Sequence, residues 1–206
     1  MSTDAPLRLL LADDQSLVRA GLAALLDLEP DMEVVAQTGS GADVIALVRE
    51  QAVDVALLDV EMPGVDGIEA AAALRDSGLE CRVLIVTTFG RPGYLSRALE
   101  AGADGFVVKD VPAEQLAEAV RRVGRGERVV DPSLAAETLS LGGSPLTERE
   151  RDVLRAALEG APVRQIAAAL HLSPGTVRNH LSSAIGKTHT STRAEAAAVA
   201  RDRGWL

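Results

Sequence analysis

The stretch Val53-Asp54-Val55-Ala56-Leu57-Leu58-Asp59 decides the fold. Its apolar residues run without alternation, which is typical of a strand covered by helices on both faces of a parallel sheet. Residues 81–87 have the same character, and further short apolar runs occupy 7–12, 32–37 and 104–109. Stretches with helical spacing follow these runs and begin near Ser16, Ala42, Gly67, Pro92 and Pro112. Five such repeats predict a parallel α/β domain.

The composition excludes several other classes of protein. The chain has 206 residues, of which 47% are hydrophobic and 25% charged, as in an ordinary globular protein. No run approaches the roughly 18 apolar residues of a membrane span. The start of the chain also lacks the basic and apolar layout of a signal peptide. We therefore expect a cytoplasmic protein with no membrane partner. A single cysteine, Cys81, excludes an internal disulfide.

Charge divides the chain into two halves. Residues 1–140 have a net charge of −12, whereas residues 141–206 have a net charge of +3. This predicts an acidic regulatory domain joined to a domain that approaches a polyanion. The sequence Gly142-Gly143-Ser144-Pro145 is typical of a hinge between domains. We predict a first domain over 1–125, a linker over 126–145 and a second domain over 146–206.

The second domain is predicted to be all-α, with four helices. Thr147 and Glu150 match a capping box, which opens a helix that should end at Gly160. A second helix begins at Pro162. Ser173 and Pro174 supply the N-cap and first position of a third helix, which reaches about Lys187. A fourth occupies 193–203.

The carboxyl ends of the predicted strands hold a group of reactive side chains, because parallel strands all end at the same edge of a sheet. These side chains are Asp13, Asp14, Asp59, Thr87 and Lys109. Each alone has an ordinary explanation, such as a helix cap or a solvated charge. Three carboxylates at the ends of buried strands, however, need a cation. Ligands that are all oxygen favour Mg²⁺ or Mn²⁺.

Lys109 is distinctive because the chain contains 19 arginines and only two lysines. A lysine at this position therefore indicates a specific role for its side chain. Its compact ammonium group suits pairing with one phosphoryl oxygen or with Asp59 itself.

The third helix of the second domain has a small, polar and basic arc opposite its apolar stripe. The arc contains Arg178, Asn179, Ser182 and Ser183, which suit the edges of bases in a major groove. Thr176 and Lys187 suit phosphate contacts. A solvated helix face is an equally common reading of such a stretch alone. The order helix, short turn, N-cap, helix favours DNA binding.

Duplex DNA is favoured over single strands or RNA, because the chain has four aromatic residues and only Trp205 lies in this domain. A module of charge +3 should bind weakly. We therefore expect two chains to act together on neighbouring half-sites.

Four motifs mark the strand ends of the first domain: Leu10-Leu11-Ala12-Asp13-Asp14, Leu57-Leu58-Asp59-Val60-Glu61-Met62-Pro63-Gly64, Thr87-Thr88 and Gly105-Phe106-Val107-Val108-Lys109. With these motifs the domain resembles the receiver domain of bacterial two-component response regulators. The resemblance implies a flavodoxin-like fold with strand order 2-1-3-4-5. It also implies that Asp59 accepts a phosphoryl group from a sensor histidine kinase. Mg²⁺ would then be held by Asp14, Asp59 and the backbone carbonyl of Glu61, and by Asp13 through water.

The resemblance further implies a conformational switch. Thr87 would move to donate a hydrogen bond to the phosphoryl group, and Phe106 would rotate into the space behind it. The surface of the fourth helix, fifth strand and fifth helix would be remodelled. Phe106 has no hydroxyl where many receivers have tyrosine, so only the packing part of the switch can operate.

The second domain contains the motifs Leu146-Thr147-Glu148-Arg149-Glu150, Ser173-Pro174-Gly175-Thr176-Val177-Arg178-Asn179-His180 and Arg193-Ala194-Glu195-Ala196. With these motifs it resembles the LuxR-type helix-turn-helix of NarL/FixJ regulators. Residues 87–94 and the ending at 203–206 resemble the DesR-type branch. The resemblance implies a transcription factor that dimerises on phosphorylation and binds promoter DNA. One departure is Thr188, where the family usually has leucine, and with Gly186 it predicts that the recognition helix frays early.

Two alternatives belong to other classes of function. A Mg²⁺-dependent phosphatase of the haloacid dehalogenase type also uses an aspartate at the end of a strand. That chemistry needs a second aspartate two residues later, where this chain has Glu61. The other alternative keeps the DNA-binding domain but makes the first domain an interaction module that works without phosphorylation.

Overall fold

The computed structural model describes residues 5–88, 90, 92–131, 134–135, 144–158 and 160–206. The described chain divides into two compact units, one built around a sheet and one built of helices. Residues 142 and 143 of the predicted hinge lie outside the described residues. Each unit is considered by itself.

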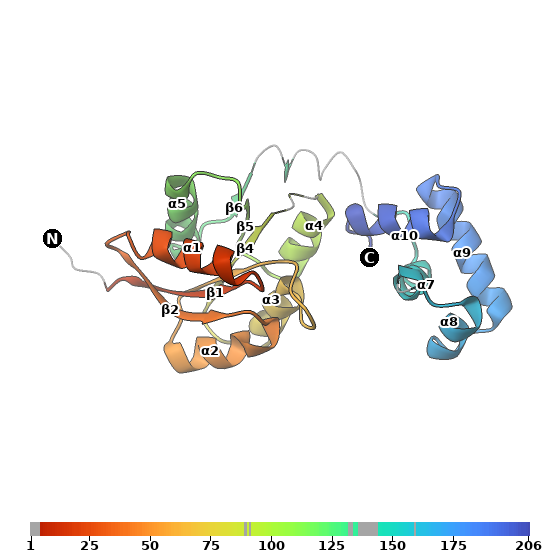
Figure 1. Ribbon diagram of the computed structural model, residues 1–206, viewed down its shortest axis with the longest axis horizontal. Helices are drawn as coiled ribbons and strands as arrows, with labels where there is room; N and C mark the ends of the chain where they lie inside the picture. Colours follow the sequence, from red (N-terminus) through yellow and green to blue (C-terminus); the bar gives the residue numbers. More distant parts are fainter. Residues whose placement is uncertain (1–4, 89, 91, 132–133, 136–143, 159) are drawn as a thin grey trace. The chain divides into compact units, whose positions relative to one another are not determined.

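The first unit is a parallel sheet with helices on both faces (Figure 1). Within the described residues the strands are β1 (Leu7–Ala12), β2 (Met32–Thr38), β3 (Val55–Leu58), β4 (Arg82–Thr87), β5 (Gly105–Val108) and β6 (Val129–Val130). They lie in the order β2-β1-β3-β4-β5-β6. The predicted flavodoxin-like order 2-1-3-4-5 is confirmed. The sixth strand was not predicted, because two residues are too few to show a period in the sequence.

Helices alternate with the first five strands as the sequence predicts. They are α1 (Ser16–Leu26), α2 (Val44–Gln51), α3 (Gly67–Asp76), α4 (Pro92–Glu100) and α5 (Ala113–Gly124), with a short 3₁₀ turn η1 (Gly41–Asp43) before α2. The sheet separates two apolar clusters. One contains residues of α2, α3 and α4, and the other contains residues of α1 and α5. Strand β3 is buried along its whole length, which explains its unbroken apolar sequence.

The second unit is a bundle of helices around its own apolar core. Within the described residues these are α7 (Glu148–Leu158), α8 (Val163–Ala169), α9 (Pro174–Thr188) and α10 (Arg193–Asp202). Buried side chains of all four helices share one cluster, which also contains Trp205. The predicted capping box is present, since the Glu150 amide lies 3.3 Å from Thr147 Oγ1 and the Thr147 amide lies 2.7 Å from Glu150 Oε2.

The expected early fraying of the third helix was wrong. Helix α9 continues to Thr188, which is buried and whose hydroxyl donates to the carbonyl of Ala184 at 2.9 Å. This bond satisfies the polar side chain where a leucine would pack. The helix then ends on His189, which has the left-handed conformation of a C-cap.

No helix in the part of the chain that the structure describes is both long enough and apolar enough to span a lipid bilayer.

Candidate metal centre and nucleic-acid interface

Three carboxylates meet at the carboxyl edge of the sheet, where β1 and β3 end. Asp13, Asp14 and Asp59 each offer one oxygen, and these oxygens lie within 4.8 Å of one another. Asp13 and Asp59 are only 3% exposed, whereas Asp14 is exposed. The backbone places them, because the Asp59 amide donates to the carbonyl of Ala12 at 2.8 Å and so aligns the ends of β3 and β1.

Lys109 lies against two of these carboxylates. Its Nζ is 2.7 Å from Asp13 Oδ2 and 3.2 Å from Asp59 Oδ2, and its side chain is 8% exposed. The Lys109 amide donates to the carbonyl of Thr87 at 2.8 Å, which fixes the residue beside the end of β4. One ammonium group cannot balance three carboxylates, so the site keeps an excess of negative charge.

Asp59 has an unsatisfied oxygen. Its Oδ1 is buried and has no hydrogen-bond partner within the described part of the chain. Burial raises the pKa of Asp59, and the neighbouring Lys109 opposes that rise. A buried oxygen without a partner is costly, and a cation at this position would remove the cost. The donor atoms are all carboxylate oxygens, so the residues present fit a hard divalent cation.

Further residues position this edge. The Gln15 amide donates to Asp13 Oδ1 at 2.8 Å, and the Arg19 guanidinium donates to the backbone carbonyl of Asp13. At Gly67, a Cβ would lie 2.0 Å from the carbonyl oxygen of Asp59, so only glycine lets α3 start this close. The sequence analysis missed Arg19 and Gly67, because their contacts depend on how loops approach each other.

Glu61 is exposed on the loop that follows β3. Its Oε1 accepts a hydrogen bond of 3.2 Å from the hydroxyl of Tyr94, a buried residue of α4. Arg97 of α4 also pairs with Asp66 of the same loop at 3.6 Å. Helix α4 is thus linked to the loop beside Asp59 at two points.

The two residues predicted to form the switch are both fully buried. Thr87 ends β4 at the carboxyl edge, and Phe106 lies one strand away in β5, paired in register with Ile85. Phe106 belongs to the apolar cluster on the α4 side of the sheet.

Helix α9 presents only part of its predicted DNA-binding set to solvent. Arg178, Asn179, Ser182 and Ser183 are exposed, whereas Lys187 is partly buried. Thr176 is partly buried, and its hydroxyl lies 2.8 Å from that of the N-cap Ser173.

Ser183 and Lys187 also contact Glu150 of α7. The Ser183 hydroxyl donates to Glu150 Oε1 at 2.6 Å, and Lys187 Nζ donates to Oε2 at 2.7 Å. The Glu150 side chain is 5% exposed. Burial alone would raise the pKa of Glu150, but hydrogen bonds from Lys187, Ser183 and Thr147 outweigh it and lower the pKa to about 2. Sequence analysis identified Glu150 only as part of a capping box.

Comparisons with known proteins identify both units. Residues 9–121 match the response regulator receiver domain, and residues 144–200 match the bacterial regulatory proteins of the luxR family. The chain belongs to the LuxR-type response regulators. It is 42% identical to the transcriptional regulatory protein DesR of Bacillus subtilis, over 95% of this chain and 97% of DesR.

Other similar proteins agree with this assignment. The nitrate/nitrite response regulator protein NarP of Escherichia coli is 35% identical, over 93% of each chain. The crystal structure of the response regulator ChrA, from a heme-sensing two-component system, matches with a TM-score of 0.60 and 34% identity, over 98% of this chain and 100% of ChrA. The predicted family and its DesR-type resemblance are confirmed. The protein is a two-component response regulator and transcription factor, and the alternative of a phosphatase is set aside.

Proposed function

We propose that Asp59 is the phosphoacceptor and that a sensor histidine kinase is the donor. The observation that carries this proposal is the buried Oδ1 of Asp59, which has no hydrogen-bond partner among the residues that the structure describes and belongs to a carboxylate beside Lys109. In the transfer, a carboxylate oxygen of Asp59 forms a bond to phosphorus while the bond from phosphorus to the histidine nitrogen breaks. The product is an acyl phosphate, and the histidine leaves with the electron pair of the broken bond.

We further propose that Mg²⁺ is the ion that binds here, with Mn²⁺ as a substitute. Asp14, Asp59 and the backbone carbonyl of Glu61 would hold it directly, and Asp13 through water. The bound ion supplies positive charge that offsets the equatorial phosphoryl oxygens.

Side chains of the protein bind the phosphoryl group and transmit its effect to the rest of the domain. Lys109 exchanges its bond to Asp59 for one to a phosphoryl oxygen, because that oxygen carries more charge than the carboxylate. Thr87 donates its hydroxyl to another phosphoryl oxygen. Phe106 then turns into the space that Thr87 leaves, which changes the packing on the α4 side of the sheet.

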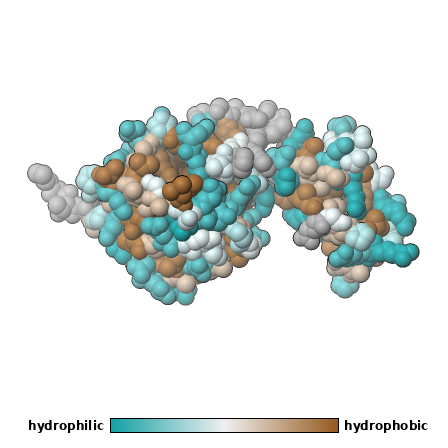
Figure 2. All heavy atoms as spheres, viewed as in Figure 1, coloured by the Kyte–Doolittle hydropathy of each residue, from teal (hydrophilic) through white to brown (hydrophobic). Residues whose placement is uncertain are grey.

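A surface that suits the kinase lies directly beside the acidic edge. Helix α1 starts three residues after Asp13, and its outward face is apolar, with Leu17 85% exposed and Leu25 44% exposed. Figure 2 shows hydrophobic side chains gathered on this side of the first unit. Exposed leucines on the apolar outward face of one helix are typical of a protein contact.

The second unit is proposed to bind promoter DNA as a duplex, in the cytoplasm where that DNA lies. Arg178, Asn179, Ser182 and Ser183 are exposed side chains of α9 that suit base edges, and Thr176 and Lys187 suit phosphates. Ser183 and Lys187 also position α9 on α7, because both donate to Glu150. Phosphorylation of Asp59 promotes a homodimer that places two copies of α9 on neighbouring half-sites.

Sedimentation velocity of the full chain with a duplex of its operator tests this function. We expect acetyl phosphate with Mg²⁺ to shift the protein from monomer to dimer and to tighten DNA binding at least about tenfold. The matched control is Asp59→Asn, which keeps the size of the side chain and should not respond. A variant that binds DNA as tightly as the phosphorylated wild type would instead support the phosphorylation-independent module.

A further inference from the structure

The segment after α5 returns to the sheet and covers the edge of β5. Strand β6 pairs with β5 in parallel, with Val129 opposite Gly105 and Val130 opposite Phe106. The Val129 amide donates to the carbonyl of Asp104 at 3.1 Å. At Gly105, a Cβ would lie 3.0 Å from the carbonyl oxygen of Val129. The start of the linker therefore lies directly against the strand that carries Phe106.

Side chains of the same segment share the apolar cluster of Phe106. Val130 and Leu134 belong to the apolar cluster that contains Phe106 and Tyr94. Leu134 is 6% exposed, and its amide donates to Asp131 Oδ1 at 3.1 Å. Val129 points to the opposite face and joins the cluster of α5, as alternation along a strand requires.

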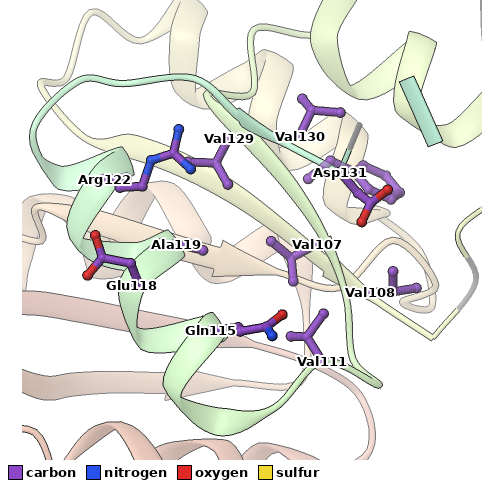
Figure 3. A pocket seen from close by; sticks show the side chains of 11 residues that line it. Val107, Val108, Val111, Gln115, Glu118, Ala119, Arg122, Val129, Val130 and Asp131 are labelled. Carbon is purple, nitrogen blue, oxygen red and sulfur yellow. The ribbon is translucent and has the colours of Figure 1, made fainter. Parts of the chain in front are cut away.

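The other side of β6 is incompletely packed. A pocket of about 270 Å³ lies between β5, α5 and β6 (Figure 3). Its lining includes Val107, Val111, Gln115, Ala119 and Val129. The pocket leaves a gap between α5 and part of this segment, and the ladder that joins β6 to β5 is only two residues long. Segments beside such a gap open at a lower cost than the fully packed core of a domain.

We propose that Val129, Val130, Asp131 and Leu134 form a strap that docks on β5 in the resting state and is released when Asp59 is phosphorylated. The proposal rests on the proposed function, in which Phe106 turns toward Thr87. The parallel register places Val130 beside Phe106, so movement of the ring removes packing from both Val130 and Leu134. The strap is the first part of the linker, and its release carries the signal out of the first unit.

The coupling must act in both directions. A contact that is made only in the resting state stabilises that state. Weakening the strap therefore favours the phosphorylated conformation even before phosphorylation.

Hydrogen exchange with mass spectrometry on the full chain tests the strap. With acetyl phosphate and Mg²⁺, we expect the amides of 129–131 to exchange at least about fivefold faster, within the usual range of coupling between sites. Leu134→Ala and, independently, Val130→Thr should produce the same increase without a phosphodonor. Leu28→Ala is the matched control, because it removes the same atoms from an exposed leucine of the same unit.

The outcomes are distinguishable. If the amides of 129–131 exchange hydrogen at an unchanged or slower rate in protein that carries one phosphoryl group, the proposed strap is wrong. The proposed function is then left intact. Equal exchange in Leu134→Ala and Leu28→Ala also overturns it. If acetyl phosphate adds no phosphoryl group at all, the proposed function fails, and the strap fails with it.

Discussion

Lys109 places a positive charge among the carboxylates at the carboxyl edge of the sheet. It pairs with Asp13 at 2.7 Å and with Asp59 at 3.2 Å, and all three side chains are almost completely buried. Breaking a buried ion pair by removing one partner is costly, because the other charge stays buried and uncompensated. The stability of the metal-free protein therefore depends on this residue.

Lys109→Met should lower the free energy of unfolding of the first unit by about 3 kcal/mol in the absence of metal. Added Mg²⁺ should recover more stability in this variant than in the wild type, because the ion replaces the missing charge. Fluorescence of Tyr94, the only tyrosine, reports on this unit during denaturation in urea.

Asp59→Asn in the Lys109→Met background is the control for that effect. Removing one carboxylate should restore more than half of the lost stability, since less charge remains uncompensated. Strictly additive losses in the double variant would show that Lys109 acts through packing and not through charge.

Much of the site was predictable residue by residue. Asp13, Asp59, Thr87 and Lys109 each end an apolar run, and strand ends of a parallel sheet must meet at one edge. Ser183 and Lys187 show the limit of this reasoning. Helical spacing placed them near Arg178 and Asn179, but it could not show that Glu150, more than 30 residues earlier, lies within their reach.

The junction of α7 and α9 depends on Glu150, which joins the start of one helix to the end of the other. The carboxylate completes the capping box of α7 and accepts bonds from two residues of α9. Its pKa is lowered to about 2, below the ordinary value of 4.5. Because the pKa of Glu150 is lower in the folded state than in the unfolded state, its carboxylate stabilises the fold at pH values above the unfolded pKa. This stabilisation is lost as the pH falls toward 2.

Glu150→Gln should therefore flatten the acid side of the stability profile of the second unit. We expect the wild type to lose up to about 3 kcal/mol between pH 5 and pH 2 through this group, and the variant to lose little of that amount. Fluorescence of Trp205, the only tryptophan and a member of this core, follows the unfolding.

Glu195→Gln is the matched control in the same unit, since Glu195 makes a similar capping box on α10 but is exposed. It should leave the acid slope nearly unchanged. Identical slopes for the two variants would contradict the role given to Glu150.

Whole strands and helices were more predictable than their ends. Long periodic stretches such as α5 and α9 determine their own type, whereas β6 is only two residues long and forms because the edge of β5 is available. Likewise, the end of α9 depends on the side-chain bond of Thr188 to the backbone, which propensity alone does not include.

The molecule as a whole combines an acidic receiver with a LuxR-type DNA-binding domain. Phosphorylation and DNA binding can influence each other only if the receiver has two conformations. The difference in free energy between these conformations must be small enough for DNA or a second chain to shift the equilibrium between them. We expect the conformational change to begin at Asp59, to involve Thr87 and Phe106, and to reach the linker through the strap. Every later step requires that the acyl phosphate forms.

Intact mass spectrometry of the full chain, incubated with acetyl phosphate and Mg²⁺, measures that step directly. We expect the gain of one phosphoryl group, located at Asp59 by peptide mapping, absent from Asp59→Asn and absent when the metal is chelated. A wild-type chain that gains no mass, or an Asp59→Asn variant that gains the same mass as the wild type, would show that Asp59 is not the phosphoacceptor.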